Sequence, residues 1–267
     1  YSENIVFMES EQTITAQYSQ EFEKLWLYSH EFGKTLQAPE FVNLYQVLNP
    51  DLFAVFNSEN FVFSKTSVLS KKPNTSVVTD FLKSQIQKAE KSLQIASTRV
   101  HLVPLMEEIK AAVDRHVKVQ IIVSQDEFST GLRGPLRDLL KANPAIELRV
   151  KFYDLRPWNY LLRQMHNKYM IVDGKMIYTG SFNWSPSSEF TYIENELLIS
   201  GLQYPQVLQS YLSNFSMLWD MNRQMYAPLL AQLNEKQTVS CAIEPMSLTV
   251  SEIYALLKLN KLTPCLA

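Results

Sequence analysis

The sequence predicts an α/β layered fold, in which a mixed or largely parallel β-sheet is flanked by helices. Helix-length segments, with apolar residues three and four positions apart, alternate with short strand-like runs between residues 78 and 152. Two of these runs are clear strands. Val117–Ser124 alternates and then becomes fully apolar, and Ile146–Phe152 alternates throughout. Strands that alternate with helices are typical of a layered sheet with both faces covered.

The expected elements follow one another in a regular order. Thr79 or Asp80 is suited to cap the first helix, whose apolar positions continue to Leu93. A capping box, Thr249-x-x-Glu252, predicts the last helix of the chain. Between them we expect a strand at 94–98, a helix around 105–113, a strand at 117–124, a helix at 135–142 and a strand at 146–152.

Two segments that are far apart in the sequence have the same layout and form an internal repeat. Each opens with Glu-Asn and a strand-like run, at Glu3-Asn4 and at Glu194-Asn195. Each continues with three aromatic residues spaced by four, which places them on one face of a helix. These are Tyr18, Phe22 and Trp26 in the first segment and Tyr211, Phe215 and Trp219 in the second, after a two-residue insertion.

The residues that carry chemistry lie in one motif, His-x-Lys-x4-Asp-x6-Gly-Ser-x-Asn, followed by Glu eleven positions later. Two positions apart on a strand, the histidine and lysine point to the same face, which suits a nucleophile or acid beside a phosphate-binding cation. Asp-Gly predicts a hairpin turn, and the asparagine amide can donate to a phosphate oxygen. The residues are His166, Lys168, Asp173, Gly180, Ser181, Asn183 and Glu194.

This motif resembles the HKD motif of the phospholipase D superfamily, which includes bacterial phospholipase D-like phosphodiesterases and nucleases. The resemblance implies a phospholipase D-like layered fold in which two repeats are related by a pseudo-two-fold axis. On this view 1–26 is the tail of a first repeat, 27–75 is a connection, 76–220 is the second, catalytic repeat, and 221–267 is a C-terminal helical extension.

The resemblance also implies a mechanism that needs two motifs and neither a metal nor a cofactor. One histidine attacks phosphorus to give a phosphohistidine, and the other protonates the leaving oxygen and then activates water. His166, in the second repeat, is expected to be the acid–base partner, and Lys168 and Asn183 to bind phosphate. Glu194 is expected to accept a hydrogen bond from His166. Supporting roles are expected for Asp173, Gly180 and Ser181, and for Glu3, the first-repeat equivalent of Glu194.

A second motif is missing from this sequence. His30, His101 and His116 lack the downstream residues of the pattern and are expected to be ordinary. If Glu3 is equivalent to Glu194, the first histidine would lie about 25 residues before Tyr1. We therefore expect the chain to be the C-terminal part of a two-motif enzyme, with an N-terminal fragment as its partner. The alternative is a homodimer that pairs His166 with its own copy, against which the Glu3 repeat argues.

The sequence leaves open which phosphodiester is the substrate. The net charge is −2, but residues 131–175 contain nine basic and four acidic residues, which suits an anionic substrate. Aromatic residues in 156–160, with Phe182 and Trp184, are suited to stack on nucleic-acid bases or, with Leu161 and Leu162, to contact lipid, although Phe182 is better suited to the core. We expect a phospholipase D-like activity. An endonuclease is the alternative, and an inactive half that binds a partner or phosphate is the alternative from another class.

The two cysteines bear on where the protein works. Cys241 and Cys265 lie near the C-terminus, and a disulfide between them is slightly favoured over two free thiols. Together with a first residue other than Met, this gives an expectation of a secreted or periplasmic protein. No apolar run reaches the length that spans a bilayer.

Overall fold

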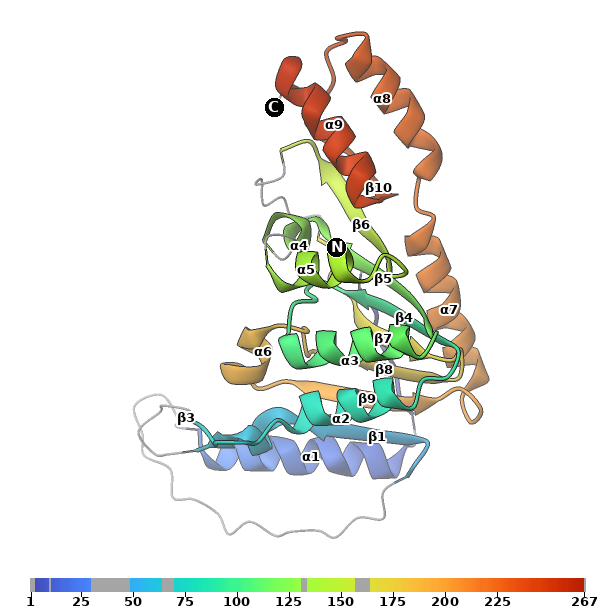
Figure 1. Ribbon diagram of the computed structural model, residues 1–267. Helices are drawn as coiled ribbons and strands as arrows, with labels where there is room; N and C mark the ends of the chain where they lie inside the picture. The colour runs from blue at the N-terminus through green and yellow to red at the C-terminus, as the bar shows by residue number, and fades with distance from the viewer. Residues whose placement is uncertain are drawn as a thin grey trace.

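An eight-stranded mixed sheet organises the computed structural model, which describes residues 3–9, 11–29, 49–63, 70–130, 134–156 and 164–266 (Figure 1). Strands β4, β5 and β6 are parallel, and every other neighbouring pair is antiparallel. Across the sheet the strands are β1 (Leu52–Phe56), β9 (Asn195–Ser200), β8 (Met176–Gly180), β7 (Lys168–Val172), β4 (Ser92–Ser97), β5 (Lys118–Ser124), β6 (Glu147–Asp154) and β10 (Ala242–Leu248).

Helices cover both faces of this sheet, as the sequence predicts. One face packs against α2 (Val77–Gln87), α3 (Val103–Asp114) and α5 (Pro135–Ala142). The other face packs against α7 (Pro205–Trp219) and the start of α1 (Gln12–Leu27), which lies along the β1 edge (Figure 1). The remaining elements are η1 (Asn57–Asn60), β2 (Phe61–Val62), β3 (Ser70–Lys71), α4 (Gln125–Thr130), α6 (Pro186–Phe190), η3 (Arg223–Met225), α8 (Tyr226–Asn234) and α9 (Val250–Leu262).

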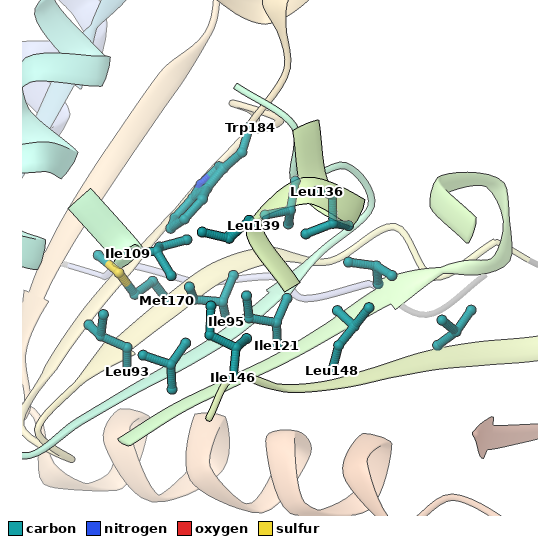
Figure 2. Close-up of a cluster of buried hydrophobic side chains, with 14 of the residues drawn as sticks. Leu93, Ile95, Ile109, Ile121, Leu136, Leu139, Ile146, Leu148, Met170 and Trp184 are labelled. Atoms are coloured by element: carbon teal, nitrogen blue, oxygen red, sulfur yellow. The ribbon is translucent and has the colours of Figure 1, made fainter. Parts of the chain in front are cut away.

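The first of these faces holds the larger core. Figure 2 shows its centre, where Leu93, Ile95 and Ile121 of the sheet lie beneath side chains such as Ile109 of α3. All four of these side chains are fully buried. Burying a side chain of this size stabilises the fold by about 1.5–3 kcal/mol. The continuous apolar run Ile121–Val123 of β5 is buried on both faces of the sheet, because helices cover each face.

The predicted hairpin between β7 and β8 is present. Asp173 and Gly174 both have positive φ, of 55° and 62°, as a two-residue hairpin turn with right-handed twist requires. The Asp173 carboxylate accepts the backbone N–H groups of Glu90, Lys91 and Ser92. Partial burial alone would raise the pKa of Asp173, but these three donors hold it below its ordinary value. Asp173 thus ties the hairpin to the start of β4.

Three segments differ from the sequence-based expectation. Residues 27–75 are more than a connection, because β1 within them pairs with β9 at the edge of the main sheet. The helical extension at 221–267 also contributes β10, an edge strand that tolerates Pro245 through an irregular register. The run after Glu3 was expected to be a strand, but described residues 3–9 form none.

The boundaries of the other predicted elements are close to those observed, except that the first helix ends at Gln87, and Leu93, which was expected to continue that helix, lies in β4. Helix α2 begins at Val77, before the predicted caps, because Thr79 donates its hydroxyl to buried Glu189 and does not cap the helix. The capping box of Thr249 and Glu252 is present at the start of α9. Cys241 and Cys265 form the expected disulfide, with Cα atoms 5.0 Å apart. No helix in the described ranges has the length and apolar character needed to cross a membrane.

Candidate active site

The motif lies at the end of the sheet that is formed by the C-terminal ends of β4, β5 and β6. Strand β7 is antiparallel to β4, with Lys168 opposite Ser97, so its first residues meet the last residues of β4. The N–H of Thr98 donates to the carbonyl of Asn167 at 3.0 Å and fixes this junction. His166 precedes β7 by two residues. The end of β8 and the start of β9 reach the same edge, so both ends of the motif and Glu194 are brought to one place.

His166 is held by a carboxylate from the far end of the sequence. Its Nδ1 lies 2.6 Å from Oε1 of Glu3, and both side chains are about half exposed, at 42% and 50%. A carboxylate at Nδ1 fixes the tautomer and the orientation of an imidazole. The partner expected from the sequence was Glu194, whereas the structure places Glu3 at Nδ1 of His166, and the carboxylate of Glu194 is affected by the charge of His166.

Asn4 explains why Glu3 reaches His166. Its side chain donates to the hydroxyls of Thr179 at 2.7 Å and Tyr211 at 3.1 Å, and it accepts a weaker hydrogen bond from Asn167 at 3.4 Å. These contacts anchor the N-terminal segment on β8, α7 and the junction before β7. Sequence reasoning did not select Asn4 as a site residue, although the repeated Glu-Asn pair contained the signal.

Lys168 is a poorly solvated cation beside this pair. Its side chain is nearly buried, and its Nζ donates to the carbonyl of His166 at 2.8 Å. Burial lowers the pKa of Lys168, while the negative charges of Glu194 and Glu3 act in the opposite direction. Because little water solvates this ammonium, an anionic ligand would strongly stabilise its positive charge.

Glu194 interacts with the charge of Lys168 and is held by α6 and η1. Its carboxylate accepts the hydroxyl of Ser188 at 3.3 Å, and its backbone N–H donates to Oδ1 of Asn57 at 2.6 Å. Burial raises the pKa of Glu194, and hydrogen bonds from Ser181 and Ser188 with the charge of Lys168 limit the rise. Asn57 is fully buried and was missed by sequence reasoning, because nothing in its local sequence marks it.

The Gly-Ser-x-Asn segment turns tightly over β9. A Cβ at position 180 would lie 2.1 Å from the carbonyl oxygen of Asn195, so Gly180 is required there. Ser181 accepts the Asn195 N–H at 3.0 Å. Oδ1 of Asn183 is buried, and no described residue donates to it. Gly180 and Ser181 therefore hold the turn, and the Asn183 carboxamide keeps unused hydrogen-bonding capacity.

The other histidines are not joined to His166 by any contact among the described residues. Nδ1 of His101 lies 2.8 Å from Oε1 of Glu127, a fully buried carboxylate at the start of α4. His116 follows α3 in a left-handed turn, with a φ of 66°. His30 lies outside the described residues. Among the described residues, no group of three or more His, Cys, Asp or Glu side chains is arranged to hold a metal ion.

The aromatic residues proposed as substrate platforms fall into two groups. Phe182 and Trp184 are buried, and Trp184 points into the core (Figure 2), so neither can stack on a substrate. Residues 157–163, with Leu161 and Leu162, lie outside the described residues. Two aromatic residues that were not predicted are exposed between the motif and Glu194, namely Phe190 at 54% and Tyr192 at 56%.

Comparison with known proteins agrees with this geometry. The family described as cardiolipin synthase, PLD-like domain, matches residues 82–219, which contain the whole motif and most of the sheet. The chain belongs to this PLD-like family. Its fold is therefore the phospholipase D-like fold, and its family is one of phosphodiester-processing proteins.

Individual relatives of this PLD-like chain are distant. A Phospholipase D of Rickettsia conorii is 27% identical over 137 residues, which is 51% of this chain and 62% of that protein. A mitochondrial cardiolipin hydrolase of Chlamydomonas reinhardtii is 37% identical over 57 residues, 21% of this chain and 24% of that protein. The chain thus spans less than two thirds of the length of these curated relatives.

Solved structures similar to this chain include the phospholipase D family member Nuc from Salmonella typhimurium. That structure is 22% identical with a TM-score of 0.47, over 64% of this chain and 95% of Nuc. NucT from Helicobacter pylori is 25% identical with a TM-score of 0.42, over 51% of this chain and 85% of NucT.

Proposed function

We propose that this chain provides the acid–base half of a phosphodiester hydrolase that works through a phosphohistidine, with phospholipid as its substrate. The observation that carries the proposal is the contact of His166 with Glu3 beside the buried ammonium of Lys168. This contact supports a role for half-exposed His166 as an oriented proton donor beside a cation that binds the anionic substrate.

In the proposed reaction, a histidine of a second motif attacks phosphorus. The new P–N bond forms as the P–O bond to the leaving group breaks, and His166 gives its proton to the departing oxygen through Nε2, since Nδ1 is bound to Glu3. His166 then takes a proton from water, which attacks phosphorus and breaks the P–N bond. Lys168 and Asn183 hold the phosphate oxygens and stabilise the added negative charge.

The proposal is tested on the chain captured from its host together with its bound proteins. The substrates are bis-p-nitrophenyl phosphate, phosphatidylcholine vesicles, and single- and double-stranded DNA, each with and without EDTA. We expect EDTA-resistant hydrolysis that falls by about 10²–10⁴-fold in His166→Ala. His116→Asn, which changes an exposed histidine in a left-handed turn, is the matched control and should retain full activity.

The same panel separates the candidate functions. Phospholipid is favoured because Phe190 and Tyr192, which lie between the motif and Glu194 in the sequence, are exposed. Exposed apolar surface of this kind is suited to contact a lipid interface. Faster cleavage of DNA than of phosphatidylcholine would replace this substrate with nucleic acid. Activity that survives His166→Ala would reject the mechanism, and a captured protein that cleaves none of the substrates would be the inactive half.

The burial of Lys168 predicts how the activity depends on pH. Burial lowers the pKa of Lys168, so this side chain should lose its proton at a lower pH than an ordinary lysine does. The enzyme should then bind the phosphate group more weakly. Lys168→Arg keeps the charge at every accessible pH and should move the alkaline fall in activity upward. If activity falls at the same alkaline pH in the wild type and in Lys168→Arg, this role of Lys168 is contradicted.

We also propose that the protein works in an oxidising compartment, such as the periplasm or the extracellular space. The Cys241–Cys265 disulfide supports this, because such bonds persist mainly outside reducing cytosol. Alkylation of free thiols in intact cells, followed by mass spectrometry, should leave both cysteines unmodified. Full alkylation of the native protein would contradict the proposal.

A further inference from the structure

The loop between β4 and α3 lies against both halves of the motif. The N–H of Thr98 donates to the carbonyl of Asn167, inside the His-x-Lys half. The N–H of His101 donates to the carbonyl of Trp184 at 2.9 Å, and Trp184 directly follows Asn183 in the other half. The backbone of His101 is therefore anchored one residue away from the carboxamide that we expect to bind phosphate.

His101 is paired with a carboxylate in the same way as His166. Its Nδ1 lies 2.8 Å from Oε1 of Glu127, against 2.6 Å between His166 and Glu3. The side chain of Glu127 is fully buried, whereas that of His101 is 25% exposed. A carboxylate at Nδ1 favours the tautomer with its proton on Nδ1, which leaves the lone pair of Nε2 to accept a hydrogen bond. No described residue is hydrogen-bonded to this Nε2.

Glu127 is buried with half of its hydrogen-bonding capacity unused. Oε1 also accepts the N–H of Val100 at 3.2 Å, but Oε2 is buried and accepts no hydrogen bond from a described residue. The guanidinium of Arg99 approaches Oε2 to 3.7 Å, which is beyond hydrogen-bond distance. Burying a carboxylate in this state costs free energy, so its presence calls for a role beyond packing.

The side chains around Glu127 carry an excess of negative charge. Arg99 lies 3.8 Å from Asp126 and 3.7 Å from Glu127, so one guanidinium serves two buried carboxylates. The next carboxylate, Asp154, is already held by two nitrogens of Arg156. With the imidazole neutral, these described side chains amount to three carboxylates and two guanidinium groups. A positively charged ligand is favoured beside such a cluster.

These observations define the group that this place is suited to bind. The lone pair of Nε2 requires a ligand that donates a hydrogen bond, and the excess negative charge favours a cationic donor. The position beside Asn183 places this donor next to the phosphate that is to be cleaved. A primary ammonium two carbons from the phosphate, as in an ethanolamine headgroup, meets all three requirements. A quaternary ammonium, as in choline, has the charge but no N–H to donate.

We propose that His101 and Glu127 form a headgroup subsite, which selects phospholipids with a primary ammonium over phosphatidylcholine. Nε2 of His101 accepts a hydrogen bond from the ammonium, while Glu127 orients the ring and supplies the negative charge. His101 determines specificity and takes no part in the proton transfers of His166. This inference rests on the proposed function, because it deepens the choice of phospholipid as the substrate.

The test compares phosphatidylethanolamine with phosphatidylcholine of the same acyl chains, each in mixed detergent micelles. The enzyme is the chain captured from its host together with its bound proteins, and the released ethanolamine or choline gives kcat/KM for each lipid. We expect the wild type to prefer the ethanolamine lipid by about tenfold or more, the worth of one hydrogen bond to a charged group. A ratio of one or below in the wild type would overturn the proposal.

Two substitutions at His101 test the role of Nε2. Asparagine keeps an amide near the position of Nδ1, in reach of Glu127, but has no atom at the position of Nε2. Glutamine brings an amide oxygen to that position and can accept the ammonium. His101→Asn should therefore lower the preference to about onefold, and His101→Gln should retain most of it. His116→Asn, the matched control outside the site, should keep the wild-type ratio.

The ratio of the two rates does not depend on how much of a variant is folded. An unchanged ratio in His101→Asn, or equal ratios in the Asn and Gln variants, would overturn the subsite. Hydrolysis of both lipids at equal rates, lost in His166→Ala, would reject the subsite and keep the proposed function. Hydrolysis of neither lipid by the wild type would reject phospholipid as the substrate, and the subsite with it.

Discussion

Helices α1 and α7 carry Tyr, Phe and Trp at the same spacing, yet their surroundings differ. Both form regular helices, and in both the Phe and Trp rings stack, at 24° in α1 and 17° in α7. Their tyrosines each meet another ring edge-on, Tyr18 with Phe56 and Tyr211 with Tyr169. The comparison teaches that local sequence determines the helix and its side-chain geometry, whereas the presence of a sheet beneath determines burial.

The largest effect expected from this difference is on stability. Phe215→Ala removes a ring that is 1% exposed and should lower the free energy of unfolding by about 3–5 kcal/mol. Phe22→Ala removes the equivalent exposed ring and should change it by no more than about 0.5 kcal/mol. Urea denaturation of the isolated chain measures both values. Equal costs would break the comparison, because they would show that α1 is already packed.

A smaller effect is expected at the position after each Glu-Asn pair, which is Glu196 in one copy and Ile5 in the other. Full burial raises the pKa of Glu196 well above its usual range, and nearby Glu194 adds to the rise. A carboxyl with a raised folded pKa gives full stability below the unfolded pKa of about 4.3, and this stability is lost as pH rises toward the folded pKa.

Glu196→Gln should therefore match the wild type at acidic pH and be more stable at alkaline pH. The difference should be about 1.4 kcal/mol for each unit by which the pKa is raised. Ile5→Gln, at the exposed equivalent position, is the control and should leave the pH dependence as it is. The measurement is the thermal midpoint as a function of pH. An unchanged slope in Glu196→Gln would contradict the assignment.

The smallest effect is expected for the hydrogen bonds that join the two copies of the internal repeat. Asn4→Ala and Tyr211→Phe should each cost about 1 kcal/mol, and the double variant should cost less than the sum because one hydrogen bond is shared. A second double-mutant cycle, of Tyr18→Phe with Asn195→Ala, should give a similar coupling energy, since the hydrogen bond between these two residues is the symmetric equivalent of the first. Additive effects in both cycles would remove the evidence for contacts between the two copies.

Much of the fold and the motif could be predicted from the sequence, because their signals are local. The α5 bounds agree with the apolar spacing, and the Asp173-Gly174 turn follows from the need for positive φ at both residues. Strand β1 could not be predicted, because a five-residue run becomes a strand there only beside the edge of β9. Strand β10 was hidden by Pro245, which is unusual within a strand.

The partner of His166 was missed for a related reason. The sequence spacing placed Glu194 behind His166, by analogy with contacts inside one repeat. The structure brings Glu3 there instead, because Asn4 binds Thr179 and Tyr211 on the second copy. Contacts exchanged between repeats depend on how the repeats are docked, and no local pattern contains that information.

The central claim is that this chain holds half of a two-histidine site, and that a distinct lobe completes it. The most direct test is hydrolysis of bis-p-nitrophenyl phosphate by the isolated chain, measured over a wide range of protein concentrations. The account predicts a rate no higher than that of His166→Ala at every concentration, while the complex captured from the host is active. A rate for the isolated chain that rises with the square of its concentration, and that His166→Ala abolishes, would contradict the account and establish a homodimeric site.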